Sequence, residues 1–365
     1  MSEFNLIQKH FTRPTRLTDL GVGDDAALVR VAAGMQLAIS TDMSVAGTHF
    51  LHDCAPYDIG WKALAVNVSD MAAMGAQAKW VTLAIALPEI LPSPSQGEGE
   101  DGCQRTEIHS TPTPASTPTL ALPPKEGGKI TEAWLAEFSH GFFACADAFD
   151  IDLIGGDTTR GPLNISVTIM GEVSTGKALR RDGAKVGDDI WVSGTLGNAA
   201  LALAVLQKRY EIDKNWQGIN LEEHELEKWL HCLNRPQPRA ALGLALQGIA
   251  TSCIDVSDGL LADLGHILTA SNLGAEIDLE KLPVSLYNLN HLHEAAIQHC
   301  VLAGGDDYEL CFTAPPSQRA HIEMIAKQQN ILLTNITSTR MDTSLQVMYQ
   351  NIPLTLLKQG FDHFA

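Results

Sequence analysis

Strand-type and helix-type hydrophobic patterns alternate along most of the chain, and this alternation restricts the fold more than any other feature. Short apolar runs predict strands, and apolar residues at helical spacing predict helices between them. The predicted strands cover residues 37–41, 80–87, 151–154, 164–173, 189–193, 253–256, 275–279, 308–313 and 331–336. The predicted helices cover residues 56–74, 131 onward, 198–208, 222–232, 238–247, 258–271 and 315–329. We therefore expect an α/β protein.

The chain length predicts two such units. A domain usually has roughly 150 residues, and the chain has 365, of which 45% are hydrophobic, so each unit can bury a core. The stretch 176–188, rich in Gly, Lys and Asp, is the best boundary. We predict an N-terminal domain of residues 1–175 and a C-terminal domain of residues 176–365.

Residues 91–129 differ from the rest of the chain in composition. They hold seven of the 17 prolines, five glycines, nine serines or threonines and no aromatic residue. Such a segment buries too little apolar surface to offset the entropy of ordering, so we predict a disordered insertion without a chemical role. Its removal joins the strand 80–87 to a helix that opens at Thr131, a residue suited to cap it.

Charge and cysteine content exclude several classes of protein. The net charge is −18, and no basic cluster is longer than Arg180-Arg181, which argues against nucleic acid and anionic membranes as partners. Seven widely spaced cysteines without a Cys-x-x-Cys pair argue against a disulfide framework and indicate a reducing cytoplasm. The N-terminus lacks a signal-peptide pattern, and no apolar run approaches the ~20 residues of a membrane helix.

Several familiar motifs match the sequence pattern but lack a residue or a structural context that they require. Residues 171–178 resemble a phosphate loop, but Ala178 replaces the hydroxyl residue that would hold Mg²⁺. The glycines of residues 97–102 match a dinucleotide fingerprint inside the predicted insertion, with no strand before them. Residues 255–259 lack the alternating ligands of a calcium loop. Gly-x-Ser-x-Gly and a helical His-x-x-x-His are missing, which argues against serine and zinc hydrolases.

Aspartates follow apolar runs or glycines at six places in the sequence. They end the strings 21–25, 39–42, 67–70, 154–157, 254–258 and 304–307. A rigid turn fixes the short carboxylate of Asp, and converging carboxylates with room for water are what Mg²⁺ requires when it binds phosphates. Each Asp taken singly fits a turn or a helix cap equally well. Together they indicate a site that uses Mg²⁺ to attract anions to an acidic chain.

Seven strings resemble the thiamine-monophosphate kinase family, which belongs to the superfamily of aminoimidazole ribonucleotide synthetase. They are GVGDD (21–25), ISTDMSVAGTHF (39–50), KALAVNVSDMAAMGA (62–76), LIGGDTTRG (153–161), IDVSDGL (254–260), GGDDYEL (304–310) and GFDHF (360–364). The resemblance implies a two-domain α/β fold of the α+β type: an N-terminal sheet-and-helix domain that pairs in a homodimer, and a C-terminal α/β domain. The insertion is foreign to the family pattern.

The resemblance also implies an activity: direct transfer of the γ-phosphate of ATP to thiamine monophosphate, giving thiamine diphosphate and ADP. It assigns Mg²⁺ ligands to Asp25, Ser40, Thr41, Asp42, Asp70, Asp157, Asp255 and Asp258. It assigns ATP contacts to Gly156, Asp157, Arg181 and Ser257, and substrate contacts to His49, Asp306 and Phe361. Asp306 stands where many members have Glu.

Elementary chemistry agrees with this assignment. An acceptor that is already a phosphate needs no strong general base, so positioning and cations carry most of the catalysis. The rival readings are a synthetase of the aminoimidazole ribonucleotide type and a non-catalytic Mg²⁺-nucleotide sensor. Selenophosphate synthetase and the hydrogenase-maturation dehydratase depend on a Cys near one end of the chain, whereas the first Cys here is Cys54 and the last residues are Asp-His-Phe-Ala.

Overall fold

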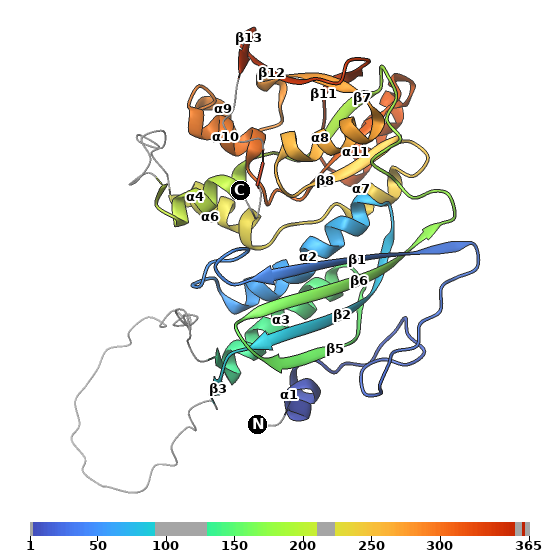
Figure 1. Ribbon diagram of the computed structural model, residues 1–365, viewed down its shortest axis with the longest axis vertical. Helices are drawn as coiled ribbons and strands as arrows, with labels where there is room; N and C mark the ends of the chain where they lie inside the picture. Colours follow the sequence, from blue (N-terminus) through green and yellow to red (C-terminus); the bar gives the residue numbers. More distant parts are fainter. Residues whose placement is uncertain (1–2, 92–129, 210–222, 355–359, 362–365) are drawn as a thin grey trace, which may run out of the picture.

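The computed structural model describes residues 3–91, 130–209, 223–354 and 360–361. Figure 1 shows two halves stacked along the long axis, each with its own sheet and helices. No helix in the described ranges is long and apolar enough to cross a membrane.

The lower half in Figure 1 contains a four-stranded sheet in the order β1-β6-β2-β5. The strands are β1 (Met35–Val45), β2 (Gln77–Leu87), β5 (Asp152–Arg160) and β6 (Asn164–Ser174). Strands β2 and β5 run parallel, and the other neighbours run antiparallel. Helices α2 (Pro56–Ala73) and α3 (Glu132–Ala148) cover one face, and α1 (Glu3–His10) lies near α3 and β5.

Helices α2 and α3 approach each other closely because glycines lie at their contact. A Cβ on Gly60 would lie 2.1 Å from the carbonyl oxygen of Phe138, and a Cβ on Gly141 would lie 1.9 Å from that of Tyr57. The predicted cap of the second helix is confirmed, since the Thr131 side chain accepts the backbone N–H of Trp134 at 3.1 Å. The buried core of this half lies between these helices and the sheet.

The upper half contains a seven-stranded sheet in the order β13-β12-β9-β11-β7-β10-β8. Its strands are β7 (Asp189–Ser193), β8 (Ser252–Val256), β9 (Gly274–Asp278), β10 (Glu309–Ala314), β11 (Leu333–Arg340), β12 (Leu345–Tyr349) and β13 (Ile352–Leu354). The helices are α4 (Asn198–Leu206), α6 (Glu223–Asn234), α7 (Ala240–Ala245), α8 (Leu260–Ser271), α9 (Leu286–Asn290), α10 (Ala295–Ala303) and α11 (Arg319–Gln329).

Helix α2 joins the two halves. It contacts α7 and β8 of the upper half as well as the elements of its own half. A buried cluster at this junction contains Ala72 of α2 together with Trp191, Leu242 and Phe312. The division of the chain at residues 175 and 176 stays a prediction, but it falls between the elements of the two sheets.

The α/β class predicted from the sequence is confirmed, and most predicted elements lie where the patterns place them. The prediction is wrong at some boundaries: the helix expected from residue 315 begins at Arg319 after a 3₁₀ turn, and the strand expected at 331–336 is Leu333–Arg340. Helix α10 was not predicted, because it is apolar on nearly every side and shows no helical stripe. The segment 171–178 leads into no helix before β7, which agrees with the rejection of a phosphate loop.

The predicted insertion lies outside the described residues apart from Leu91, but the structure shows how its two ends meet. Strands β3 (Ile90–Leu91) and β4 (Ile130–Thr131) pair in parallel, and the N–H of Ile130 donates to the carbonyl of Glu89 at 3.0 Å.

Replacement of residues 92–129 by a short Gly-Ser linker should therefore leave the fold intact. We expect the melting temperature to change by less than roughly three degrees, because the paired ends already define the junction. Thermal unfolding by circular dichroism checks this outcome. A loss of many degrees would show that the segment contributes to the core.

Candidate active site

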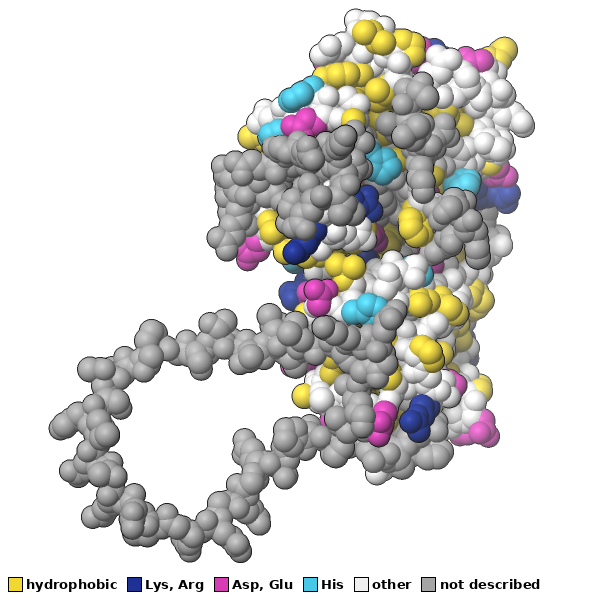
Figure 2. Space-filling view, turned by 60° about the vertical axis from the view of Figure 1, so that its left-hand side comes forward, with side chains coloured by type: hydrophobic (Ala, Val, Ile, Leu, Met, Phe, Trp, Pro, Cys, Tyr) yellow, Lys and Arg dark blue, Asp and Glu magenta, His cyan; other side chains and the backbone are white. Residues whose placement is uncertain are grey.

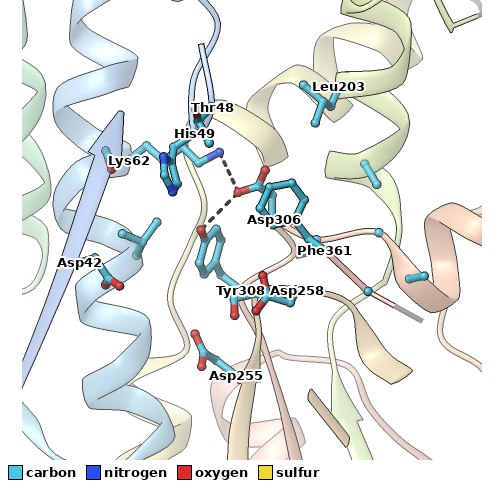
Figure 3. A pocket seen from close by; sticks show the side chains of 18 of the residues that line it. Asp42, Thr48, His49, Lys62, Leu203, Asp255, Asp258, Asp306, Tyr308 and Phe361 are labelled. Atoms are coloured by element: carbon cyan, nitrogen blue, oxygen red, sulfur yellow. Dashed lines mark hydrogen bonds and ion pairs between the residues drawn. The ribbon is translucent and has the colours of Figure 1, made fainter. Parts of the chain in front are cut away.

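A cavity of about 670 Å³ opens between the two halves. Its walls come from β1 and the loop after it, from α2, α4 and α10, from the turn after β8 and from the loop before β10. In Figure 2, His, Lys and Arg side chains are visible on the face where the halves meet. Figure 3 shows the charged side chains that point into the cavity.

Carboxylates from both halves form one end of this cavity. Asp42 comes from β1, Asp70 from α2 and Asp255 from β8. The Ser40 hydroxyl donates to Oδ2 of Asp70 at 2.5 Å, and the Ser69 hydroxyl donates to Oδ2 of Asp255 at 2.7 Å. These bonds fix the carboxylates of Asp70 and Asp255.

Burial and mutual repulsion disfavour the charged form of these groups. The pKa of Asp42 rises to about 7, first through burial and then through the charges of Asp70 and Asp255. The pKa of Asp255 also rises to about 7, again through burial first and the charge of Asp70 second. Burial raises the pKa of Asp70 too, against the opposing effects of the Ser40 hydrogen bond and the charge of Arg181. A cation bound here would relieve this repulsion.

The donor set suits Mg²⁺, because it consists of hard carboxylate oxygens with hydroxyl groups beside them. Among the described residues, no group of three or more His, Cys, Asp or Glu side chains is arranged to hold a metal ion. Mg²⁺ itself commonly takes only one or two carboxylates from a protein and fills its shell with waters and phosphate oxygens.

The turn 257–259 brings Ser257 and Asp258 to the cavity wall. It follows β8 and precedes α8, so the strand end fixes its direction. The buried Asp263 of α8 accepts hydrogen bonds from the backbone of this turn. Burial raises the pKa of Asp263 to about 7, while the N–H groups of the turn lower it.

The other end of the cavity carries His49, Asp306 and Phe361, the residues to which the resemblance assigns substrate contacts. Nδ1 of His49 accepts the N–H of Val45 at 3.0 Å, which fixes the ring. Asp306 has a left-handed backbone with φ of 70° and Phe361 is 53% exposed. The end thus combines an imidazole, a carboxylate and an aromatic face.

Lys62 and Tyr308 also belong to this end, and the sequence analysis missed both. Nζ of Lys62 lies 2.8 Å from Oδ1 of Asp306, and the Tyr308 hydroxyl donates to the same oxygen at 3.2 Å. The Lys62 side chain is only 12% exposed. The available signal was helical spacing, since Lys62 precedes Asp70 by two turns on the same face of α2.

The remaining predicted residues lie outside this cavity. Asp25, Gly156 and Asp157 line a second cavity of about 540 Å³, next to β5 and α1. The Thr41 hydroxyl pairs with that of Thr168 at 2.9 Å on the exposed face of the sheet, away from Asp42. Arg181 is exposed, although its charge still lowers the pKa of Asp70. One chain alone therefore does not bring all the predicted ligands together.

Asp42→Asn tests whether the acidic end is a cation site. The folded state raises the pKa of Asp42 from 3.8 to about 7, so its ionisation destabilises the fold increasingly between these values and fully above pH 7. At pH 8 without divalent cations the variant should melt a few degrees above the wild type, and at pH 4 the difference should nearly vanish. Addition of Mg²⁺ should raise the melting temperature of the wild type more than that of the variant.

Differential scanning calorimetry with and without Mg²⁺ checks both signs. Asp19→Asn is the matched control, because Asp19 is an exposed carboxylate paired with Arg30 outside both cavities. An Asn variant that melts lower at pH 8 and responds equally to Mg²⁺ would make Asp42 a structural hydrogen-bond partner only.

Comparison with known proteins agrees with this geometry. Residues 23–108 and 111–173 match the N-terminal domain, and residues 185–334 the C-terminal domain, of AIR synthase related proteins. The thiamine-monophosphate kinase of Salmonella typhimurium is 40% identical, with 100% of this chain and 98% of the relative aligned. The crystal structure of the Stenotrophomonas maltophilia K279a enzyme shares 42% identity over 94% of this chain and 93% of its own, with a TM-score of 0.73.

A further solved structure, AaThiL complexed with AMPPCP and TMP, is 25% identical over 99% of this chain and 96% of its own, with a TM-score of 0.67. These likenesses extend over both halves of the fold and over the strings that carry the aspartates. The chain belongs to the thiamine-monophosphate kinase family.

Proposed function

We propose that this protein transfers the γ-phosphate of ATP directly to thiamine monophosphate, giving thiamine diphosphate and ADP. The observation that carries the proposal is one cavity lined both by Asp42, Asp70, Asp255 and Asp258 and by the acceptor set His49, Asp306 and Phe361. Family membership over the full chain supports it, as does the solved relative with AMPPCP and TMP. In this assignment Ser257, Gly156, Asp157 and Arg181 contact ATP.

Several Mg²⁺ ions would be held by Asp42, Asp70, Asp255 and Asp258, with Asp25 and Asp157 as further ligands and Ser40 as a minor one. Thr41 is not included, because its hydroxyl pairs with that of Thr168 away from Asp42. Bound there, Mg²⁺ supplies positive charge that lets two polyanions approach each other. The residues of the chain orient the reactants. The carboxylates on β1, α2 and β8 project from regular secondary structure and not from loops, so their positions are fixed. The acceptor phosphate is anionic near neutral pH, so no side chain has to remove a proton from it.

The acceptor end suits the thiamine moiety, which is a flat heteroaromatic system with a positive charge. Phe361 offers a ring face to this cation, and Asp306 offers a carboxylate. Asp306 is one methylene shorter than the common Glu, so a water can bridge its contact with the substrate. His49 is held by Val45 at the wall of the same end.

We also propose a homodimer in which the four-stranded sheets pair. The uncovered face of β1 exposes Leu37, Ile39 and Met43, with Ile39 60% and Met43 55% exposed. Asp42 and Asp157 lie on the two edge strands, β1 and β5, which are separated by two strands or roughly 14 Å. We infer that Asp157 of one subunit completes the site that contains Asp42 of the other.

We assign the protein to the cytoplasm. The cysteines of the described residues are all free thiols, and four of them are buried. Thiols that pack in the core without pairing are typical of a reducing compartment.

The activity is tested by incubation with ATP, Mg²⁺ and thiamine monophosphate, followed by chromatography of thiamine diphosphate and ADP. Asp306→Ala and Phe361→Ala should raise the KM for thiamine monophosphate roughly tenfold, equivalent to about 1.4 kcal/mol, with little change for ATP. Leu286→Ala is the matched control, because Leu286 is exposed and lies outside both cavities. ATP binding without turnover would indicate a sensor, and a higher KM for ATP alone would mean a misassigned pocket.

Subunit complementation tests the shared site. Asp42→Asn and Asp157→Asn homodimers should both be nearly inactive, whereas a purified heterodimer of the two should regain roughly half of the wild-type activity, because one of its sites holds both native carboxylates. The Asp42→Asn with Asp70→Asn heterodimer is the control and should stay inactive, since both residues line one cavity of one chain. An inactive first heterodimer would place Asp42 and Asp157 of one site in the same subunit.

A further inference from the structure

One peptide turn, residues 257–259, supports both substrate regions of the cavity. Ser257 and Asp258 line the cavity themselves. The carbonyl of Ser257 accepts the backbone N–H of Asp306 at 2.9 Å, and the carbonyl of Asp258 accepts that of Phe361 at 3.1 Å. The backbone of the turn therefore holds two of the residues assigned to thiamine monophosphate.

Glycines bring the neighbouring segments into direct contact with this turn. A Cβ on Gly305 would lie 2.4 Å from the carbonyl oxygen of Ser257, and a Cβ on Gly360 would lie 3.0 Å from that of Asp258. Gly259 has φ of +114°, and its Cβ would lie 2.7 Å from the carbonyl carbon of Ala303. Because these contacts leave little space, a shift of the turn has to move the two acceptor segments as well.

Asp263 holds the turn through its N–H groups. Oδ2 of Asp263 accepts the N–H groups of Ser257, Asp258 and Gly259 at 3.0, 3.0 and 3.2 Å. Asp263 lies in the first turn of α8, is 3% exposed and is not among the residues that line the cavity. Three N–H donors that end on one buried oxygen tie the whole turn to this side chain.

We propose that Asp263 is a positioning residue which, through the turn 257–259, sets the geometry of the nucleotide region and the acceptor region together. The inference deepens the proposed function and rests on it for the assignment of residues to the two substrates. Asp263 does not line the cavity, so its loss acts on both regions through one backbone element. A purely structural residue would change the melting temperature and leave both Michaelis constants unaltered.

The variants Asp263→Ala and Asp263→Asn distinguish a positioning role from a purely structural one. Asp263→Ala removes the acceptor, and we expect the KM values for ATP and for thiamine monophosphate both to rise roughly tenfold or more, with a lower kcat. All three hydrogen bonds end on one oxygen, which the amide of Asn can replace in the same geometry. Asp263→Asn should therefore keep both constants within roughly threefold of the wild type, because its carbonyl oxygen still accepts these bonds.

The matched control is Asp188→Ala. Asp188 is a buried carboxylate of the same half, 4% exposed, and it accepts the N–H of Lys185 at 2.9 Å and the hydroxyl of Thr251 at 2.6 Å. It lines neither cavity. Its loss should lower the melting temperature and leave both KM values unchanged.

Backbone hydrogen exchange gives a readout that does not depend on turnover. In Asp263→Ala the N–H groups of residues 257–259, Asp306 and Phe361 should exchange faster than in the wild type, whereas those of α3 should not change. Protection that is unchanged at Asp306 and Phe361 would overturn the proposal. So would a rise in only one KM, or an Asn variant as impaired as the Ala variant.

Asp263→Glu serves if Asp263→Ala fails to fold. It keeps the charge but moves the acceptor oxygen by one methylene, so the same joint rise in both KM values is expected, and wild-type constants would overturn the proposal. A wild-type protein that forms no thiamine diphosphate would contradict the proposed function instead. The exchange experiment would still decide the role of Asp263.

Discussion

Close backbone contact between helix α2 and its neighbours is the constraint on which the rest of the structure depends. Gly60 and Gly141 let α2 reach α3, and Gly243 lets α7 reach the end of α2 from the other half. A methyl group at these three positions would lie 2.1, 1.9 and 2.0 Å from a carbonyl oxygen. Because α2 also carries Asp70, the position of this one helix determines where the acidic end of the cavity lies.

The acidic end of the cavity holds carboxylates that repel one another in the folded protein. Asp42, Asp70 and Asp255 come from different elements, and the packing of both halves brings their carboxylates together. The buried cores on either side supply the favourable free energy that offsets this repulsion. In the proposed function, bound cations would let a chain of net charge −18 accept polyanions at such a place, and the fold already holds the carboxylates that would bind them.

Much of the fold could be predicted from the sequence, because the strands and helices that face a core on one side carry a clear period. Helix α10 has no polar face, and strand β13 has only three residues, so neither gives a period to detect. The aspartates of the cavity could be singled out because each stands in a short string that joins an apolar run to a polar residue or glycine. The expectation that turns fix them is wrong for Asp42, Asp70 and Asp255, which lie within β1, α2 and β8. The sequence could not show that Asp25 and Asp157 lie apart from Asp42, since that depends on tertiary packing. Lys62 and Asp263 could not be singled out, because their contacts with Asp306 and with the backbone of the turn 257–259 arise only in the folded chain.

Helix α2 also fixes the distance between two residues that line the cavity. Lys62 and Asp70 are eight residues apart on one face, which corresponds to about 12 Å along the axis. The ion pair of Lys62 with Asp306 connects this helix across the cavity to the other half. A regular helix neither stretches nor shortens, so the separation between the acidic end and the acceptor end is a fixed length of the protein. Any ligand that contacts both ends of the cavity therefore has to span a separation that the helix keeps constant.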